Sequence, residues 1–188
     1  MKLRLGAPIN YGALGIRKRL ELAEKYLVLQ NWMNFLDLGC GNGAYTIEMA
    51  SKARMVIGVD IERNRLNQFQ SEVIARNVYN VKIIQSDGQR LCFKDNTFDI
   101  VTLIEVIEHV PSEEKLLAEI YRVLKSDGKL VIFAPNKYYP FEAHGGRIWN
   151  IKLSNRLPFL SWLPAPIHNL ISHARIYTSN GLKRILRA

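Results

Sequence analysis

The sequence predicts an α/β fold built on a Rossmann-like, doubly wound parallel sheet. Between Phe35 and Asn136, short apolar runs alternate with stretches of helical composition, which is the pattern of repeated strand, helix and strand units. The first run breaks into three glycines at alternate positions, and the later runs end in polar residues. Buried parallel strands have this apolar composition, and ligands bind at their carboxyl ends.

The first half of the chain predicts three helices and three strands. Residues 16–30 and 62–76 each place apolar side chains at helical spacing among polar ones, and residues 55–60 are a β-branched run that ends in a carboxylate. The expected elements are helices over 16–30, 44–53 and 62–76, a strand from Phe35 into the glycines, and strands over 55–60 and 81–87. The apolar faces expected of the two outer helices are Ile16, Leu20, Ala23 and Leu27, and Leu66, Phe69, Val73 and Ile74.

The second half predicts two further strands and then a change of character. A helix is expected between these two strands, because acidic residues occupy its first turn and Gly128 provides a stop at its end. Residues 137–173 are rich in Pro and Trp without a clear period, which favours an insert or lid. The expected elements are a strand over 98–104, a helix over 112–125, a strand over 129–136, and a last helix capped by Thr178 or Ser179.

Length and composition indicate one domain over residues 1–188. The chain is 48% hydrophobic and 23% charged, as is usual for a soluble domain with a sizeable core. The N-terminus has no apolar signal-peptide region and no run is long enough to span a membrane, so we expect a cytoplasmic protein. Cys40 and Cys92 form neither a disulfide framework nor a metal cluster, and we expect both to be buried thiols without a metal.

The net charge of +9 is concentrated at the two ends of the chain. Residues 1–20 hold five Lys/Arg and no acid, and residues 143–188 hold seven and no acid. Basic flanks of this kind can meet phosphate, nucleic acid or an anionic membrane surface, although solvated Lys/Arg without a partner is more frequent. Charge alone therefore ranks substrates poorly.

The glycine turn and the strand ends predict a nucleotide pocket. Gly39, Gly41 and Gly43 follow a buried strand and precede a helix, so a ligand can approach the main chain closely there. Asp60 lies 19 positions after Gly41, the spacing at which an acid accepts hydrogen bonds from ribose hydroxyls. The same glycines with Ala44 also fit a nicotinamide dehydrogenase, which the fingerprint alone does not exclude.

Five motifs in order make the resemblance specific. FLDLGCGNG, VIGVDI, IIQSDGQRLCF, FDIVTLIEVIEHV and LKSDGKLVIFAPN lie in sequence between residues 35 and 136. Over residues 14–136 the chain resembles the class I S-adenosylmethionine-dependent methyltransferases. That family completes its sheet with a sixth strand and an antiparallel seventh, for which we find no sequence, so we expect five parallel strands without that hairpin. The chain is then a shortened form, or its fifth-strand edge is covered by other residues or by a homodimer.

The resemblance implies roles for the strand-end residues. The glycine turn with Asp37 holds the methionine and ribose part of S-adenosyl-L-methionine, Asp60 the ribose hydroxyls, Asp87 and Gly88 the adenine, and the Glu105 region lies near the sulfonium. The implied cofactor-binding residues are Asp37, Gly39, Cys40, Gly41, Asp60, Ile61, Asp87, Gly88 and Glu105.

Methyl transfer asks little of side chains, because the thioether leaves without protonation and positioning supplies most of the catalysis. A hydroxyl acceptor would need a general base, for which Glu108, His109, His144 and His173 are candidates. His109, after the fourth strand, is the first choice and Glu108 the second. The expected substrate-binding residues are Asn136, Tyr138, His144, His173 and Arg175.

The insert and the basic flanks indicate the chemical class of the methyl acceptor. An apolar, Trp-rich insert over residues 137–173 favours a small molecule with an apolar part, lipid-linked acceptors included, and predicts a cover over the acceptor or over the fifth strand. The basic flanks favour RNA as the alternative acceptor. A non-catalytic, cofactor-binding subunit that needs a partner chain is the alternative of another class.

Overall fold

The computed structural model describes residues 14–27, 30–140, 146–148, 151–153, 159–164, 167–168, 171–172 and 174–187. Contacts divide the chain into two compact units. The sheet unit is Ala7–Ile104 with Lys115–Ile132, and the C-terminal unit is Met1–Gly6, Glu105–Glu114 and Phe133–Ala188. The organisation of residues 1–188 as one domain stays a prediction.

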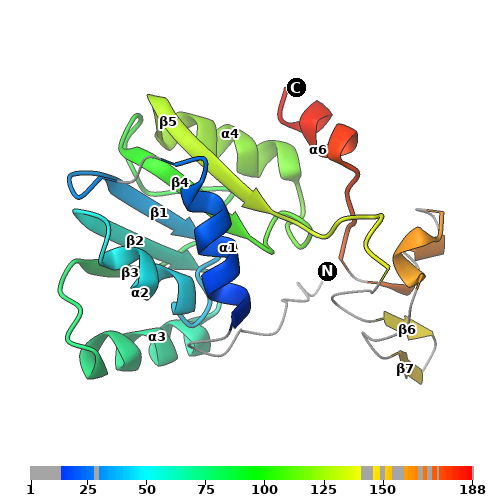
Figure 1. Ribbon diagram of the computed structural model, residues 1–188, viewed down its shortest axis with the longest axis horizontal. Helices are drawn as coiled ribbons and strands as arrows, with labels where there is room; N and C mark the ends of the chain where they lie inside the picture. Colours follow the sequence, from blue (N-terminus) through cyan, green and yellow to red (C-terminus); the bar gives the residue numbers. More distant parts are fainter. Residues whose placement is uncertain are drawn as a thin grey trace. The chain divides into compact units, whose positions relative to one another are not determined.

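The sheet has five strands in the order β3-β2-β1-β4-β5, and it confirms the predicted α/β, Rossmann-like class with five parallel strands. Parallel registers pair Phe35 with Val56 on one side and with Ile100 on the other. The arrowheads of β1, β4 and β5 point the same way (Figure 1). The strands are β1 (Asn34–Leu38), β2 (Met55–Asp60), β3 (Val81–Gln85), β4 (Phe98–Ile104) and β5 (Leu124–Phe133).

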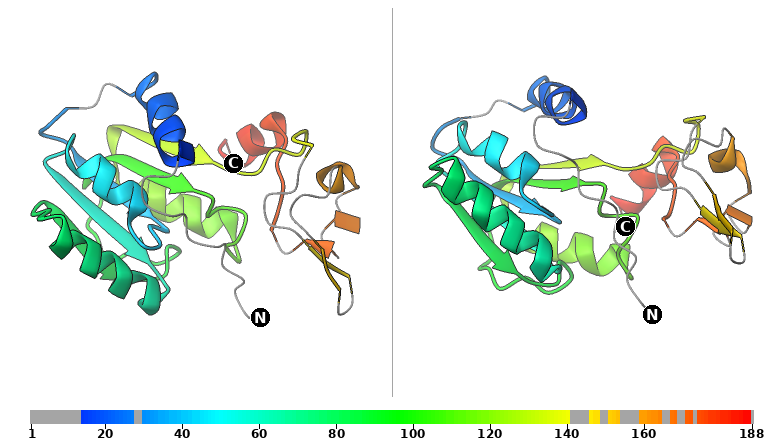
Figure 2. Two further views of the ribbon diagram at one scale, coloured as in Figure 1. Left: turned by 60° about the horizontal axis from the view of Figure 1, so that its bottom comes forward. Right: turned by 90° about the horizontal axis from the view of Figure 1, so that it is seen from below.

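Helices cover both faces of the sheet. The four helices are α1 (Leu14–Glu24), α2 (Ala44–Ala50), α3 (Arg63–Ala75) and α4 (Glu113–Val123). Both views of Figure 2 place α1 and α4 on opposite sides of β4 and β5. Ile16 and Met49 pack with Phe35. Leu38, three positions further along β1, lies with Leu116 close to Gly88. Since successive side chains of a strand point to opposite faces, both faces of β1 are buried.

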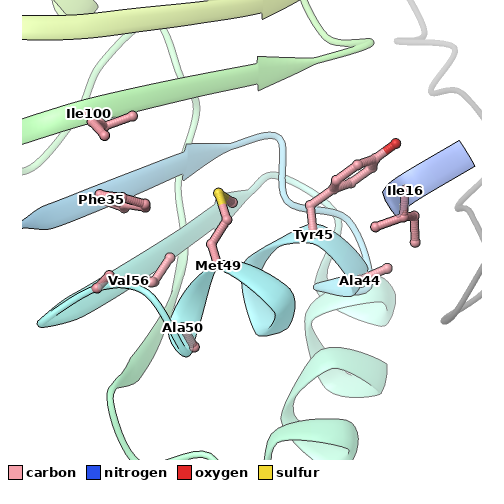
Figure 3. Packing of buried hydrophobic residues seen from close by; sticks show 9 residues of the cluster. Ile16, Phe35, Ala44, Tyr45, Met49, Ala50, Val56 and Ile100 are labelled. Carbon is pink, nitrogen blue, oxygen red and sulfur yellow. The ribbon is translucent and has the colours of Figure 1, made fainter. Parts of the chain in front are cut away.

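The core on the α1 and α2 face is one apolar cluster. It joins Ile16 of α1 to Tyr45 and Met49 of α2 and to Phe35, Val56 and Ile100 of three neighbouring strands (Figure 3). A second cluster gathers around Phe69, which is fully buried. Leu66, Phe69 and Val73 are buried as predicted, but Ile74 is wrong as a core residue because it is 67% exposed.

The ends of two helices differ from the prediction. Helix α1 ends at Glu24, whereas the apolar spacing extended to residue 30. Helix α4 ends at Val123 and β5 begins at the next residue, so Gly128 lies inside the strand and does not stop the helix. The carbonyl of Val123 accepts a hydrogen bond from the Thr97 amide at 2.8 Å, so tertiary bonding determines where α4 ends. The fifth strand consequently runs over 124–133, earlier than the predicted 129–136.

The C-terminal unit contains short elements. The hairpin of β6 (Gly146–Ile148) and β7 (Ile151–Leu153) is antiparallel, and η1 is a 3-10 turn over Leu160–Trp162. Helix α6 (Ser179–Ile185) begins at Thr178, whose hydroxyl accepts from the Gly181 amide at 3.0 Å, which confirms Thr178 as the predicted cap. Much of the 137–173 insert lies outside the described residues, and its role as a lid stays a prediction.

The two thiols differ in their surroundings. Cys40 is buried as predicted, and burial raises the pKa of its thiol well above the ordinary value. Cys92 is exposed, so the prediction of a buried thiol there is wrong; it lies in an irregular segment before β4. Within the described residues, no three His, Cys, Asp or Glu side chains are grouped to hold a metal ion. No helix in that part of the chain has the length and apolar character needed to cross a membrane.

Candidate functional site

The glycine turn after β1 is held at the carboxyl end of the sheet by main-chain bonds. The amides of Gly39 and Cys40 both donate to the carbonyl of Val59 in β2, at 2.7 and 3.0 Å. Gly39, Gly41 and Gly43 have φ of 79°, 56° and 85°. These left-handed conformations strain any residue with a Cβ, so the sequence of three glycines is required by the path of the backbone.

Gly41 and Gly43 have different surroundings. A Cβ on Gly43 would lie 2.0 Å from the Phe69 ring, so this glycine lets α3 pack under the turn. Gly58 of β2 also leaves room for the Phe69 ring, because a Cβ on Gly58 would lie 2.6 Å from that ring. A Cβ on Gly41 would meet nothing within 4 Å. Of these two glycines, Gly41 is therefore the one at which a ligand can approach the main chain.

Asp60 ends β2 and binds the glycine turn. Its Oδ2 accepts from the Gly41 amide at 2.8 Å, and its Oδ1 accepts from the Glu62 amide at 2.8 Å. The side chain is buried, with 6% exposed, so it is more enclosed than a carboxylate that simply faces a cleft. Because a carboxylate oxygen accepts two hydrogen bonds, each oxygen retains capacity for a ribose hydroxyl. The residues of the turn therefore fit an adenosyl cofactor.

Asp37 lies inside the sheet unit, and its carboxylate binds two threonines. Thr46 donates to Oδ2 at 2.6 Å and Thr102 donates to Oδ1 at 2.9 Å. Burial raises the pKa of this carboxyl to about 6, although the two hydroxyls oppose the rise and the charge of Asp60 adds to it. Asp37 thus joins β1, α2 and β4 beneath the turn, and its implied contact with the cofactor stays a prediction.

We expect Asp37 to make the protein less stable as the pH rises. A carboxyl whose pKa is raised from 3.8 to about 6 on folding binds its proton more tightly in the folded state, so stability is present at low pH and falls between these values. The loss from about pH 4 to about pH 8 is roughly 2 to 3 kcal/mol. Asp37→Asn should lack this slope in urea unfolding measured across that range. Parallel slopes for both proteins would contradict the assignment.

Asp87, Gly88 and Ile61 lie at the carboxyl ends of β2 and β3. Asp87 is exposed, and its Oδ1 accepts from the Gln89 amide at 2.9 Å, which shapes the turn. A Cβ on Gly88 would lie 3.0 Å from Leu116, so Gly88 permits close packing of α4. Ile61 is exposed beside Asp60. The contacts of Asp87 and Gly88 are explained by the turn and by packing, without a ligand. The cofactor-binding roles of all three residues stay predictions.

Glu105, Glu108 and His109 follow β4 in the C-terminal unit. Glu105 adopts a φ of 57°, and its amide donates to the Phe133 carbonyl at 2.8 Å. A residue with a side chain in this conformation stores strain, which is often found at functional sites. Glu108 is only 2% exposed and His109 is half-buried. Their assignment as catalytic residues stays a prediction.

Arg175 holds the loop after β4 in place. Its guanidinium donates to the carbonyls of Val110 and Pro111 at 2.7 and 3.2 Å, and its own amide donates to the Glu108 carbonyl at 3.2 Å. Glu113 lies 3.9 Å from the guanidinium. These bonds occupy the side chain with the protein itself, so the geometry gives Arg175 a positioning role, and its substrate contact stays a prediction.

Tyr177 also holds the segment after β4 in place. Its hydroxyl bonds the Ile107 carbonyl at 3.2 Å and donates to Glu113. Burial, and then the bond to Glu113, raise the pKa of the phenol well above its ordinary value. Its main chain bonds Pro135 and Lys137 at 3.0 and 2.9 Å, in a parallel bridge just beyond β5. Residues near the C-terminus thereby pair with the chain that leaves the fifth strand.

We expect Arg175→Ala to loosen the loop after β4. Two main-chain carbonyls lose charged donors, which should cost about 1 to 3 kcal/mol locally. Hydrogen exchange of amides 106–110 should accelerate by roughly tenfold or more, whereas Arg184→Ala on the exposed face of α6 should leave it unchanged. Unchanged exchange with a raised KM for an acceptor would instead identify Arg175 as a substrate-binding residue.

The remaining residues predicted to bind the substrate are Asn136, Tyr138, His144 and His173. Asn136 Oδ1 accepts from the Tyr138 amide at 3.0 Å, forming a turn. Tyr138 is exposed. His144 and His173 lie outside the described residues. The sequence patterns missed Thr46, Thr102 and Glu113, because hydroxyls inside a helix or strand and an acid in a first helical turn have common structural explanations.

Comparison with known proteins identifies the family. Residues 36–132, more than half of the chain, match the family described as "Methyltransferase domain". The chain is 34% identical over 124 residues to demethylmenaquinone methyltransferase of Geobacillus sp. (strain WCH70), covering 63% of this chain and 53% of the relative. It is 31% identical to sterol 4-C-methyltransferase strm-1 of Caenorhabditis elegans, covering 60% and 34%. The chain therefore spans about half the length of the first relative.

A solved structure agrees with the fold. A SAM dependent methyltransferase from Aquifex aeolicus superimposes with a TM-score of 0.64 at 21% identity, covering 92% of this chain and 85% of that one. At this identity the likeness concerns the fold alone. The matched domain extends from β1 through most of β5 and includes the glycine turn and Asp60. On the strength of that match, this chain belongs to the class I S-adenosylmethionine-dependent methyltransferase family.

Proposed function

We propose that this chain transfers the methyl group of S-adenosylmethionine to a small-molecule acceptor with an apolar part. The observation that carries the proposal is the turn itself, where Gly41 has open space beside it and donates its amide to Asp60. Two relatives are named for demethylmenaquinone and for a sterol, which are small and largely apolar molecules. No observation of the described residues favours RNA as the acceptor.

The cofactor is held by the sheet unit in this proposal. Asp60 accepts the ribose hydroxyls with the lone pairs that its two amide bonds leave available. Gly41 offers its main chain to the cofactor, and the exposed side chain of Ile61 offers an apolar surface to the adenine. Asp87 and Gly88 stand at the next strand end, where the family resemblance assigns the adenine.

The bound cofactor supplies a methyl group on a positively charged sulfur, which a nucleophilic atom of the acceptor displaces in line. The protein then contributes mainly orientation and exclusion of water. A hydroxyl acceptor adds the need for a base, and Glu108 and His109 are the proposed candidates. A carbon or nitrogen acceptor that is already nucleophilic has no such requirement.

A transfer assay with isotope-labelled methyl donor tests the function. The chain is incubated with the donor and, separately, with a demethylated quinol, a sterol, an aminoalcohol phosphate and total RNA. We expect label in an organic-extractable product, with Asp60→Ala strongly reduced and Tyr79→Ala, an exposed residue after α3, unchanged. Label in RNA alone would contradict the proposed acceptor. Activity only after addition of a partner chain would favour the non-catalytic subunit.

A further inference from the structure

Four aromatic side chains of the C-terminal unit are exposed to solvent. Tyr138, Tyr139, Phe159 and Trp162 are each between 53% and 70% exposed. The rings of Phe159 and Trp162 meet edge to face with centroids 4.7 Å apart. We call these four residues the aromatic surface. Large aromatic side chains are costly to leave in water, and gathered ones mark a place where another surface is met.

The aromatic surface is formed by two segments, residues 138–140 and 159–162, which flank the sequence stretch 141–158. The Phe159 amide donates to the Pro140 carbonyl at 2.6 Å, and the Ser161 hydroxyl donates to the Tyr139 carbonyl at 2.5 Å. These two bonds bring residues 138–140 and 159–162 side by side, although the sequence between them is long. The four aromatic residues therefore belong to one local structure.

The stretch between the two parts of the aromatic surface contains the antiparallel β6 and β7 hairpin (Figure 1). A two-stranded hairpin is marginal in water by itself. Its sequence contributes Arg147 and Lys152, and Arg156 follows it.

The charge of the whole segment favours an anionic partner. Residues 143–188 contain seven Lys/Arg and no Asp or Glu. Exposed aromatic residues next to a cationic stretch are typical of segments that lie in the interface of an anionic bilayer, where rings enter the headgroup region and cations meet lipid phosphates.

We propose that the aromatic surface, together with the basic segment 143–188, docks this protein on an anionic lipid membrane. Binding of this kind is peripheral, with the rings in the interface and the basic residues attracted by the lipid phosphates. The inference goes beyond methyl transfer and does not depend on it, because vesicle binding is measured without cofactor. A nucleic acid would also meet the cations and stack its bases on the rings, and RNA binding is therefore one outcome of the test.

Vesicle flotation of the full chain tests the proposal. Wild type should bind phosphatidylglycerol-containing vesicles and bind pure phosphatidylcholine vesicles much more weakly. Arg147→Gln/Lys152→Gln should bind about 30-fold less, because each basic residue near the surface contributes about 1 kcal/mol. The matched control, Arg90→Gln/Lys94→Gln, removes the same charge from exposed positions of the sheet unit and should change binding by less than about threefold.

The aromatic contribution has its own pair of variants. Phe159→Ala/Trp162→Ala should lose roughly tenfold or more in vesicle binding, whereas Tyr79→Ala/Tyr121→Ala, at exposed aromatic positions of the sheet unit, should lose none. Unfolding midpoints of all variants are measured, and quenching by bromine-labelled lipid should fall in Trp162→Phe. Equal losses in test and control variants, or tighter binding to RNA than to vesicles, would overturn the proposal. So would a dimer that only Phe159→Ala/Trp162→Ala dissociates.

Discussion

Gly43→Ala is expected to destabilise the protein by about 2 to 5 kcal/mol. The new methyl group would lie 2.0 Å from the Phe69 ring, and overpacking a core typically costs about 1 to 3 kcal/mol. The φ of 85° adds about 1 to 2 kcal/mol for a residue with a Cβ. Urea unfolding at neutral pH measures the sum. Phe69 is fully buried, so it has no solvent into which it can move.

Gly41→Ala is the matched control for this substitution. Its φ of 56° is also left-handed, but its Cβ meets nothing within 4 Å. It should therefore lose only about 1 to 2 kcal/mol, while its methyl group enters the space assigned to the cofactor and weakens binding. The double variant Gly43→Ala/Phe69→Leu should recover part of the lost stability. Equal losses at the two glycines would show that Phe69 does not distinguish them.

Asp60→Ala is expected to weaken S-adenosylmethionine binding by about 1.5 to 3 kcal/mol or more, which is roughly 10- to 150-fold. The substitution removes the proposed ribose acceptor and also frees the amides of Gly41 and Glu62. We therefore expect a stability loss of about 1 to 3 kcal/mol beside the affinity loss, with the fold retained. Titration calorimetry gives the affinity, and urea unfolding gives the stability.

Asp99→Ala separates these two effects. Asp99 is another buried carboxylate of the sheet unit, and it accepts from the Asn34 amide at 2.8 Å and from Lys125 at 2.7 Å. It lies near the amino end of β4, away from the strand ends that bear the turn. Its loss should reduce stability without changing the affinity for the cofactor. Normal binding by Asp60→Ala would contradict the ribose role.

The sheet could be predicted from the sequence because its strands are buried on both faces. Continuous apolar runs such as 55–60 and 98–104 have no other stable environment, and the structure places both strands as expected. The strand-end position of Asp60 followed from the same pattern. Amphipathic spacing also identified Leu66, Phe69 and Val73 as the buried residues of α3.

Features that depend on contacts between distant residues could not be predicted. The end of α4 is determined by amides at 96–97, and Gly128 therefore entered β5 and did not stop the helix. The separate tasks of Gly41 and Gly43 depend on Phe69, 26 positions after Gly43. Arg175 gave no signal of its bonds to Val110 and Pro111, because a guanidinium has no preferred sequence distance from the carbonyls that it binds.

Calorimetric titration with S-adenosylmethionine, S-adenosylhomocysteine and NAD tests the central claim most directly. The proposed site rests on the glycine turn and on Asp60, a pattern that methyltransferases and nicotinamide dehydrogenases share in part. We predict saturable binding of the first two ligands, weakened in Asp60→Ala and unchanged in Asp99→Ala, and no binding of NAD. Tight binding of NAD with no response to either S-adenosyl ligand would contradict the account.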